Sequence, residues 1–362
     1  MKRIVTILLM LAILLSLTGC KNNVSVKEIY FESLNYNNYY NFRCSCDLWI
    51  NDDIYLYNSD GFYNMRTFAY QNGSKVKLFE SNDFINETYY GEIFPINDFA
   101  YFTTSTDDNN QNFYKFSFAN QSYEKLFTTS IYSKWMGTWM GTHDYIAFSQ
   151  HRDEELTLTD LFIYNIVEDT ITPICNDILS FGIVNNKIRY LTSLNTDTLV
   201  LFEYDHTDDK SNKIGEISVK IKDEFPIYNF TNNYTTIAQY DSDDFKKITL
   251  YSSDGSSCEY SLPKSVQQFV AGEHFAYAVC YETEEYSSTA VEHKDNGIYR
   301  INLADGSYEL VETIANNDTE IHVVSDDEIY ITQYEMNFIG QYKGHVYKLI
   351  VPDKTKTKIF VI

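Results

Sequence analysis

A short polar turn followed by an apolar, strand-like segment recurs seven times along this chain of 362 residues. Successive turns begin 46, 46, 42, 47, 40 and 54 residues apart, and they start at Asn51, Asn97, His143, Asn185, Asn232, Gly272 and Asp326. A period of roughly 40–50 residues is typical of repeat architectures in which each unit buries its faces against its neighbours. The repeat therefore predicts seven similar units.

A second series of turns alternates with the first, and each of its members also lies between two apolar segments. Its members are Asn72-Gly73-Ser74, Asn120-Gln121-Ser122, Glu168-Asp169-Thr170, Asp254-Gly255-Ser256, Asp305-Gly306-Ser307 and Pro352-Asp353-Lys354, with the longer stretch Asp205–Lys213 in the fourth unit. Asn, Asp and Gly tolerate positive φ and favour hairpin turns. Each unit then reads as four short strands, which in the fourth unit are Phe181–Val184, Ile188–Thr192, Leu199–Tyr204 and Ile214–Val219.

Seven four-stranded antiparallel units predict an all-β fold, a seven-bladed β-propeller. The 32 Tyr and 24 Phe residues, against 14 Gly and 5 Pro, favour strands in the same way. Six or eight blades, or two β-sandwiches, are the alternatives. We expect the apolar positions of every strand to be buried on both faces, the first inner strand to lie near Cys44, and the last outer strand to cover Lys358–Val361.

Two segments, Tyr101–Thr104 and Asn296–Ser307, resemble the propeller repeats of bacterial exported proteins and of low-density-lipoprotein-receptor ectodomains. The resemblance extends over nearly the whole chain after residue 19, through loose motifs. It implies a β-propeller that works outside the cytoplasm. The signatures of WD40, kelch and sialidase-type repeats are absent from the sequence.

The first residues have the three zones of a bacterial export signal: basic Lys2 and Arg3, the apolar run Ile4–Leu17, and Leu17-Thr18-Gly19-Cys20. The run is shorter than the ~20 residues that a membrane-spanning helix needs. Its last four residues resemble the lipobox of bacterial lipoproteins, which implies cleavage before Cys20 and a lipid on its thiol. An ordinary secretory signal is the alternative. Because two acyl chains suffice for stable anchoring, we expect a protein lipid-anchored to the cell membrane and facing outside the cytoplasm.

The predicted domains are a signal peptide over 1–19, a lipidated spacer or closing strand over 20–41, and the propeller over 42–362. Removing Lys2 and Arg3 leaves 26 basic against 51 acidic residues, a net charge of −25. Such a charge repels nucleic acids and anionic lipid headgroups, so we expect no nucleic-acid partner.

No cofactor is predicted. The acidic groups at Asp107–Asp108, Asp205–Asp209 and Asp241–Asp244 could bind calcium, although none has a known loop spacing, and solvated turns are the simpler interpretation. The spacing of the histidines and cysteines predicts no metal site. Cys44, Cys46, Cys175, Cys258 and Cys280 are interpreted mainly as small buried hydrophobic residues, with a disulfide as the alternative.

Candidate ligand contacts come from one unusual repeat and three long loops. Trp135 and Trp139 lie in Trp135–Thr142 and either pack between blades or line the central opening. The loops Gln150–Thr159, Glu282–Asn296 and Glu335–Gly344 should lie on the side of the disc opposite the first series of turns. They contribute Arg152, Tyr286, His293, Phe338 and Tyr342, which are residue types suited to recognition or to an ordinary mobile loop.

Two functional hypotheses follow. The first is a binding or scaffolding protein, without catalysis, that contacts another protein or a cell-envelope polymer. The second is a hydrolase or lyase that acts on polysaccharide, with ionisable residues converging over the central channel. Because no local catalytic motif is present, we favour the first.

Overall fold

The structure is a computed structural model, and it describes residues 48–51, 54–61, 64–71, 74–80, 87–96, 99–106, 110–130, 139–142, 144–151, 159–219, 226–231, 235–240, 246–282, 296–314, 319–336 and 342–361. Within these ranges every regular element is a β-strand, and no helix is long and apolar enough to cross a membrane. Blade 1 is described almost entirely through its backbone.

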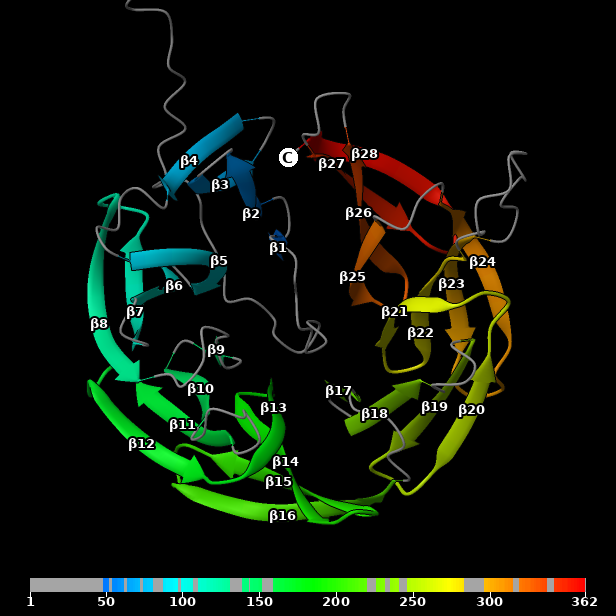
Figure 1. Cartoon of the computed structure of the whole chain (residues 1–362), viewed down its shortest axis with the longest axis horizontal. Helices are drawn as coiled ribbons and strands as arrows, with labels where there is room; N and C mark the ends of the chain where they lie inside the picture. Colours follow the sequence, from blue (N-terminus) through cyan, green and yellow to red (C-terminus); the bar gives the residue numbers. More distant parts are fainter. Residues whose placement is uncertain are drawn as a thin grey trace, which may run out of the picture.

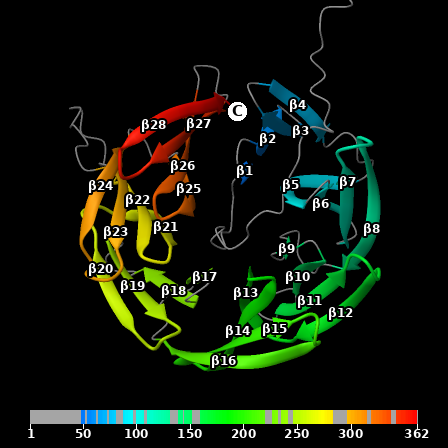
Figure 2. The ribbon, with the colours of Figure 1, turned by 180° about the vertical axis from the view of Figure 1, so that it is seen from behind.

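Seven four-stranded antiparallel sheets are arranged radially around a central opening, as Figure 1 and the view from behind in Figure 2 show. Each sheet uses four consecutive strands, so we number the sheets as blades 1 to 7 in chain order. The first strand of each blade faces the opening and the fourth lies at the circumference (Figure 1). The predicted all-β propeller is confirmed, and the described residues form seven four-stranded sheets.

Blades 1 to 4 contain β1 (Leu48–Asn51), β2 (Ile54–Gly61), β3 (Asn64–Gln71), β4 (Ser74–Glu80); β5 (Glu87–Ile96), β6 (Phe99–Thr106), β7 (Asn110–Ser117), β8 (Ser122–Ser130); β9 (Trp139–Gly141), β10 (Tyr145–His151), β11 (Thr159–Asn165), β12 (Thr170–Cys175); and β13 (Ile178–Val184), β14 (Lys187–Asn195), β15 (Thr198–Asp205), β16 (Lys210–Ser218). Blades 5 to 7 contain β17 (Ile227–Phe230), β18 (Thr235–Tyr240), β19 (Lys247–Ser252), β20 (Ser257–Ser261); β21 (Val266–Ala271), β22 (Phe275–Cys280), β23 (Gly297–Asn302), β24 (Tyr308–Thr313); and β25 (Thr319–Ser325), β26 (Glu328–Met336), β27 (Tyr342–Ile350), β28 (Thr355–Val361).

Both series of sequence turns occupy the positions that the repeat predicted. The first series joins first to second strands, and the second series joins third to fourth strands. Asn185 and Asn186 have φ values of 51° and 60°, as a tight hairpin turn requires. In the second series a residue with positive φ recurs at Gln121, Asp169, Asp209, Gly255, Gly306 and Lys354.

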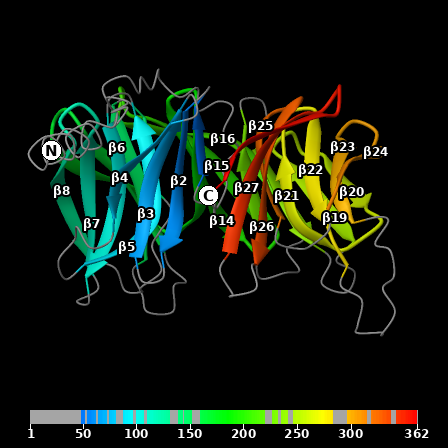
Figure 3. The same ribbon diagram turned by 90° about the horizontal axis from the view of Figure 1, so that it is seen from above.

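The strands run across the thickness of the ring, so the hairpins emerge on two opposite rims (Figure 3). Because neighbouring strands are antiparallel, the turns after first and third strands share one rim, which we call the turn rim. The connections after second and fourth strands share the other, which we call the long-loop rim. The described strand ends that flank the three predicted long loops lie on the long-loop rim, and the loops themselves lie outside the described residues.

Apolar clusters fill the interfaces between the successive blades 2 to 7, and each cluster contains side chains of both blades. Their members include Phe113 and Phe148, Tyr145 and Phe181, Leu201 and Phe230, Ile248 and Ala276, and Tyr277 and Ile329. Fully burying such a side chain stabilises the fold by about 1.5–3 kcal/mol. The stacked interfaces are thus the main core of the ring.

The prediction that every strand is buried on both faces is wrong for the outer strands. Second strands such as β10 and β22 have five consecutive buried residues, whereas β12 has no buried residue and β16 has one. Ile171 and Ile214 on these outer strands are more than two-fifths exposed. Blades diverge with distance from the centre, and the circumference has no neighbour to cover it.

The cysteine interpretation is confirmed in part. Cys175, Cys258 and Cys280 are free thiols, but only Cys280 is buried; Cys175 is half-buried and Cys258 is exposed. Burial raises the pKa of Cys280 to about 12, so its thiol is inert at neutral pH. Cys44, Cys46 and the spacer 20–41 lie outside the described residues.

Candidate functional site

The structure describes two of the residues proposed as ligand contacts. Trp139, on β9, has 8% of its surface exposed, and its indole meets the ring of Phe113 edge-to-face at 5.9 Å between centroids. It therefore packs between blades 2 and 3, the packing alternative of the sequence. Tyr342 begins β27 opposite Met336, at the end of the long β26–β27 hairpin. Cys20, Trp135, Arg152, Tyr286, His293 and Phe338 lie outside the described residues.

The base of the longest of these loops is fixed by hydrogen bonds. The Oδ1 atom of Asn296 accepts a bond from the backbone N–H of Glu282 at 3.1 Å, and its Nδ2 donates to the carbonyl of Glu282 at 3.5 Å. Asn296 is buried, and its own carbonyl accepts a bond from Ile314 N at 3.1 Å. One side chain thus holds both ends of the loop together, where the β22–β23 hairpin leaves the ring.

Two lysines from neighbouring segments secure the same base. The Glu282 carboxylate lies 2.5 Å from the Nζ of Lys246, before β19, and 2.8 Å from the Nζ of Lys264, before β21. These ammonium groups lower the pKa of Glu282, with Lys246 making the largest contribution. The contacts join blade 5 to blade 6 on the long-loop rim.

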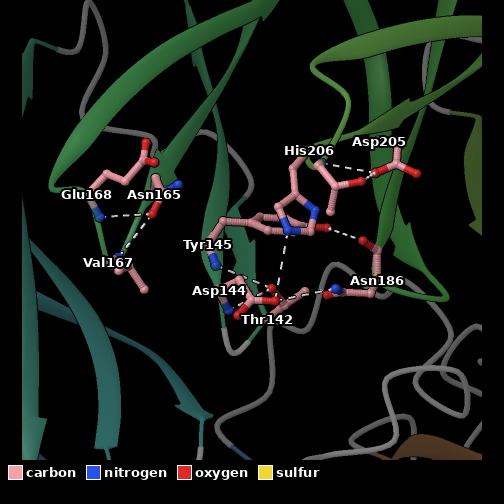
Figure 4. Close-up of polar contacts among 10 residues, drawn as sticks. Thr142, Asp144, Tyr145, Asn165, Val167, Glu168, Asn186, Asp205 and His206 are labelled. Carbon is pink, nitrogen blue, oxygen red and sulfur yellow. Dashed lines mark hydrogen bonds and ion pairs between the residues drawn. The ribbon is translucent and has the colours of Figure 1, made fainter.

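On the turn rim, a polar cluster joins blade 3 to blade 4 (Figure 4). The hydroxyl of Tyr145 donates to the carbonyl of Asn186 at 3.2 Å, and the Tyr145 ring lies 4.7 Å from the His206 ring. His206 Nε2 is 3.9 Å from the Asp144 carboxylate, which also accepts a 3.5 Å bond from Asn186 Nδ2. Burial raises the pKa of Tyr145, so its phenol stays protonated and remains a donor.

This cluster continues into blade 4 through paired charges. Lys187 bridges Asp205 and Glu203 at 3.3 and 3.1 Å, and Arg189 binds Glu203 at 3.1 Å. The guanidinium of Arg189 then donates to the carbonyl of Thr231 in the next blade at 2.8 Å. Bonds from the Thr207 hydroxyl and backbone, with Lys187 beside them, lower the pKa of Asp205 to about 2.

A related cluster joins blade 6 to blade 7 on the same rim. The hydroxyl of Tyr277 and the Nη2 of Arg300 donate to the carbonyl of Asp326 at 2.6 and 2.9 Å. Arg300 also pairs with Asp327 at 2.8 Å and lies 3.6 Å from the centre of the Phe275 ring. Both clusters thus use a tyrosine of one blade to bind the first turn of the next.

The two clusters differ in how they present a histidine. In blade 6, His274 Nδ1 lies 2.9 Å from the Asp326 carboxylate, and 70% of the His274 side chain is exposed. In blade 4, His206 is only 17% exposed, and its Nδ1 is buried with no hydrogen-bond partner among the described residues. The pair at the junction of blades 6 and 7 therefore combines a fixed imidazole with access from solvent, which is the arrangement that proton transfer requires.

No sequence motif marked His274 or Asp326, although His274 follows the sixth turn of the first series and Asp326 begins the seventh. Aligning the repeats would have shown that both belong to the first turn of adjacent units. In the part of the chain that the structure describes, no group of three His, Cys, Asp or Glu side chains could hold a metal ion.

No known family model matches this sequence, and no curated protein matches it. Solved structures match its fold. The β-propeller domain of the Trilobed protease from Pyrococcus furiosus, described as having an open velcro topology, is similar with a TM-score of 0.53 at 10% identity, over 88% of this chain and 97% of that one. Among the described strands of this chain, none is exchanged between blades 1 and 7.

Two enzymes of different kinds share the fold. Oligogalacturonate lyase in complex with manganese matches with a TM-score of 0.52 at 9% identity, over 81% of this chain and 85% of that one. An acylaminoacyl peptidase matches with a TM-score of 0.53 at 9% identity, over 89% of this chain and 52% of that one, so this chain spans about half of the peptidase. At such identities the likeness shows the β-propeller fold alone.

Proposed function

We propose that this chain is a lipid-anchored propeller, displayed outside the cytoplasmic membrane, that binds a protein or a cell-envelope polymer through its long-loop rim. The anchor rests on the sequence around Cys20. The place of binding rests on one observation, the fixed base of the Glu282–Asn296 loop. A loop longer than its hairpin needs, whose ends are joined by a buried asparagine and whose first residue binds two lysines, is typical of a recognition loop on a rigid scaffold.

Fatty-acid labelling tests the anchor. Cells that make the wild type should incorporate radiolabelled palmitate into the protein, and cells that make Cys20→Ala should not. Equal labelling of the two proteins would exclude lipidation of Cys20.

Loop replacement tests the binding rim. A variant in which short turns replace residues 283–295 and 337–341 should lose co-sedimentation with the insoluble cell-envelope fraction and in-cell crosslinks to partner proteins. Its thermal unfolding should stay close to that of the wild type, because the strands are unchanged. Val167→Ser, at an exposed position on the turn rim, is the control and should bind normally. Undiminished binding by the loop variant would move the site elsewhere.

Catalysis on a polysaccharide is the second candidate. It is supported by the fixed, exposed His274–Asp326 pair, and by the likeness to a lyase whose whole chain is nearly covered. The net charge of −25 without the signal favours an uncharged or cationic polymer over a polyanion. Release of reducing ends or of unsaturated products from envelope polysaccharide by the purified protein would support this candidate.

A further inference from the structure

We propose that His274 is the general base of an ester-hydrolysing site on the turn rim, at the junction of blades 6 and 7. The proposal goes beyond the catalytic candidate above, because it assigns the His274–Asp326 pair to ester hydrolysis and not to cleavage of the polysaccharide backbone. It does not depend on the long-loop rim.

The orientation of the imidazole follows from its partner. An ionised carboxylate only accepts hydrogen bonds, so the 2.9 Å contact with Asp326 Oδ2 places the imidazole proton on Nδ1. The lone pair of Nε2 is then free to accept a proton. Because most of the His274 side chain is exposed, a water molecule and a substrate can reach that nitrogen.

The position of Asp326 is set by blade 6. Its carbonyl accepts bonds from both Tyr277 and Arg300, and Arg300 is itself held by Asp327 and by the Phe275 ring. The backbone that carries the carboxylate is therefore fixed on both sides of the junction. Such indirect support keeps a catalytic imidazole in one tautomer and one orientation.

The junction of blades 3 and 4 shows that stability does not require this arrangement. There a tyrosine hydroxyl also binds the next turn, but the histidine is covered by the Tyr145 ring and lies 3.9 Å from its aspartate (Figure 4). Of these two junctions, only that of blades 6 and 7 has an exposed histidine within hydrogen-bonding distance of its aspartate.

The reaction that the His274–Asp326 pair suits is the hydrolysis of an ester. Cleavage of a glycosidic bond ordinarily uses two carboxyl groups on either side of the bond, whereas attack of water on an acyl carbon needs one base. His274 Nε2 takes a proton as the water oxygen adds to the acyl carbon. The tetrahedral intermediate then breaks its bond to the alcohol oxygen, which receives that proton, so that the acid and the alcohol leave and the imidazole is neutral again. An uncharged acyl ester on a hydroxyl-rich polymer is the substrate class that the acidic protein does not repel.

The test uses p-nitrophenyl acetate as the probe and the full-length protein in detergent. His274→Ala should lower the protein-catalysed rate at least ~100-fold, since general bases contribute about 10²–10⁴. Asp326→Asn should lower it at least ~10-fold, because an amide donor facing Nδ1 moves the imidazole proton to Nε2.

His206→Ala is the matched control and should keep the wild-type rate, with thermal unfolding recorded for every variant. Equal loss in His206→Ala and His274→Ala, an unchanged rate in His274→Ala, or no wild-type rate above buffer would each overturn the proposal. Ester cleavage without any attack on envelope polysaccharide would leave it standing and remove the polysaccharide-cleaving candidate. The loop-replacement variant should still cleave the ester.

Discussion

The junctions of blades 3/4 and 6/7 use the same tyrosine-to-turn hydrogen bond and end with different chemistry. At the first junction the histidine is part of the packing, with its ring against Tyr145 and one nitrogen buried. At the second, Arg300 makes the additional bond to the next blade, and His274 is left at the surface beside Asp326. A repeat fold can therefore keep its stabilising contact at one place in the unit and vary the neighbouring side chains for function.

Arg300→Ala is expected to have the largest effect on this comparison. Its side chain is 12% exposed, and its guanidinium binds both the Asp326 carbonyl and the Asp327 carboxylate. Losing those bonds and the contact with Phe275 should lower the free energy of unfolding by about 2–3 kcal/mol. Urea unfolding measures it, with Arg300→Lys as the control that keeps the charge and recovers part of the loss. A loss below about 0.5 kcal/mol, the low end for one hydrogen bond, would show that Arg300 does not join the blades.

Removing the tyrosine hydroxyl should lower the free energy of unfolding by different amounts at the two junctions. Tyr145→Phe should cost about 1–2 kcal/mol, because the Asn186 carbonyl loses the donor from blade 3. Tyr277→Phe should cost only about 0.5–1 kcal/mol, because Arg300 still donates to the Asp326 carbonyl. The double variant Tyr277→Phe/Arg300→Ala should lose more than the sum of the two single variants. Equal costs for the single tyrosine variants would contradict a shared acceptor at blades 6/7.

Replacing the histidine should also destabilise the protein more at the junction of blades 3 and 4 than at that of blades 6 and 7. His206→Ala removes a mostly buried ring and should cost about 1 kcal/mol, near the middle of the range for point variants. His274→Ala changes an exposed side chain and should stay within about 0.5 kcal/mol. Thermal unfolding at neutral pH measures both. A larger loss in His274→Ala would mean that this imidazole has a structural role.

Acid should produce the smallest effect, at Asp205 beside the blade 3/4 junction. Its folded pKa of about 2 is below the unfolded value of about 3.9, so its contribution to stability is present above about pH 4 and is lost as the pH falls through about 2. The wild type should therefore lose stability over this range more steeply than Asp205→Asn. Parallel melting curves of the two proteins between these pH values would show that the contacts of Asp205 have no net effect on folding.

The order of the strands could be predicted from the sequence because it depends on local chemistry, although in the fourth unit β13 and β16 begin three and four residues before their predicted starts. Asn185, Asn186 and Gly306 adopt the positive φ of hairpin turns, and a residue with positive φ recurs in the turn between third and fourth strands of blades 2 to 7. The period of the turns then set the number of blades. The exposure of β12 and β16 could not be predicted from the sequence. Their apolar residues resemble those of inner strands, and they are exposed because these two strands lie far from the centre of the ring.

By itself, the sequence determined the seven four-stranded units, their two sets of turns and the rim on which each loop emerges, because these follow from turn residues and from alternating apolar positions. Only the tertiary structure decided that His274 meets Asp326, 52 residues away, and that His206 is enclosed while His274 is exposed. Contacts between blades depend on how two whole sheets pack against each other. That packing is the sum of many side-chain contacts, and no local pattern around either histidine records it.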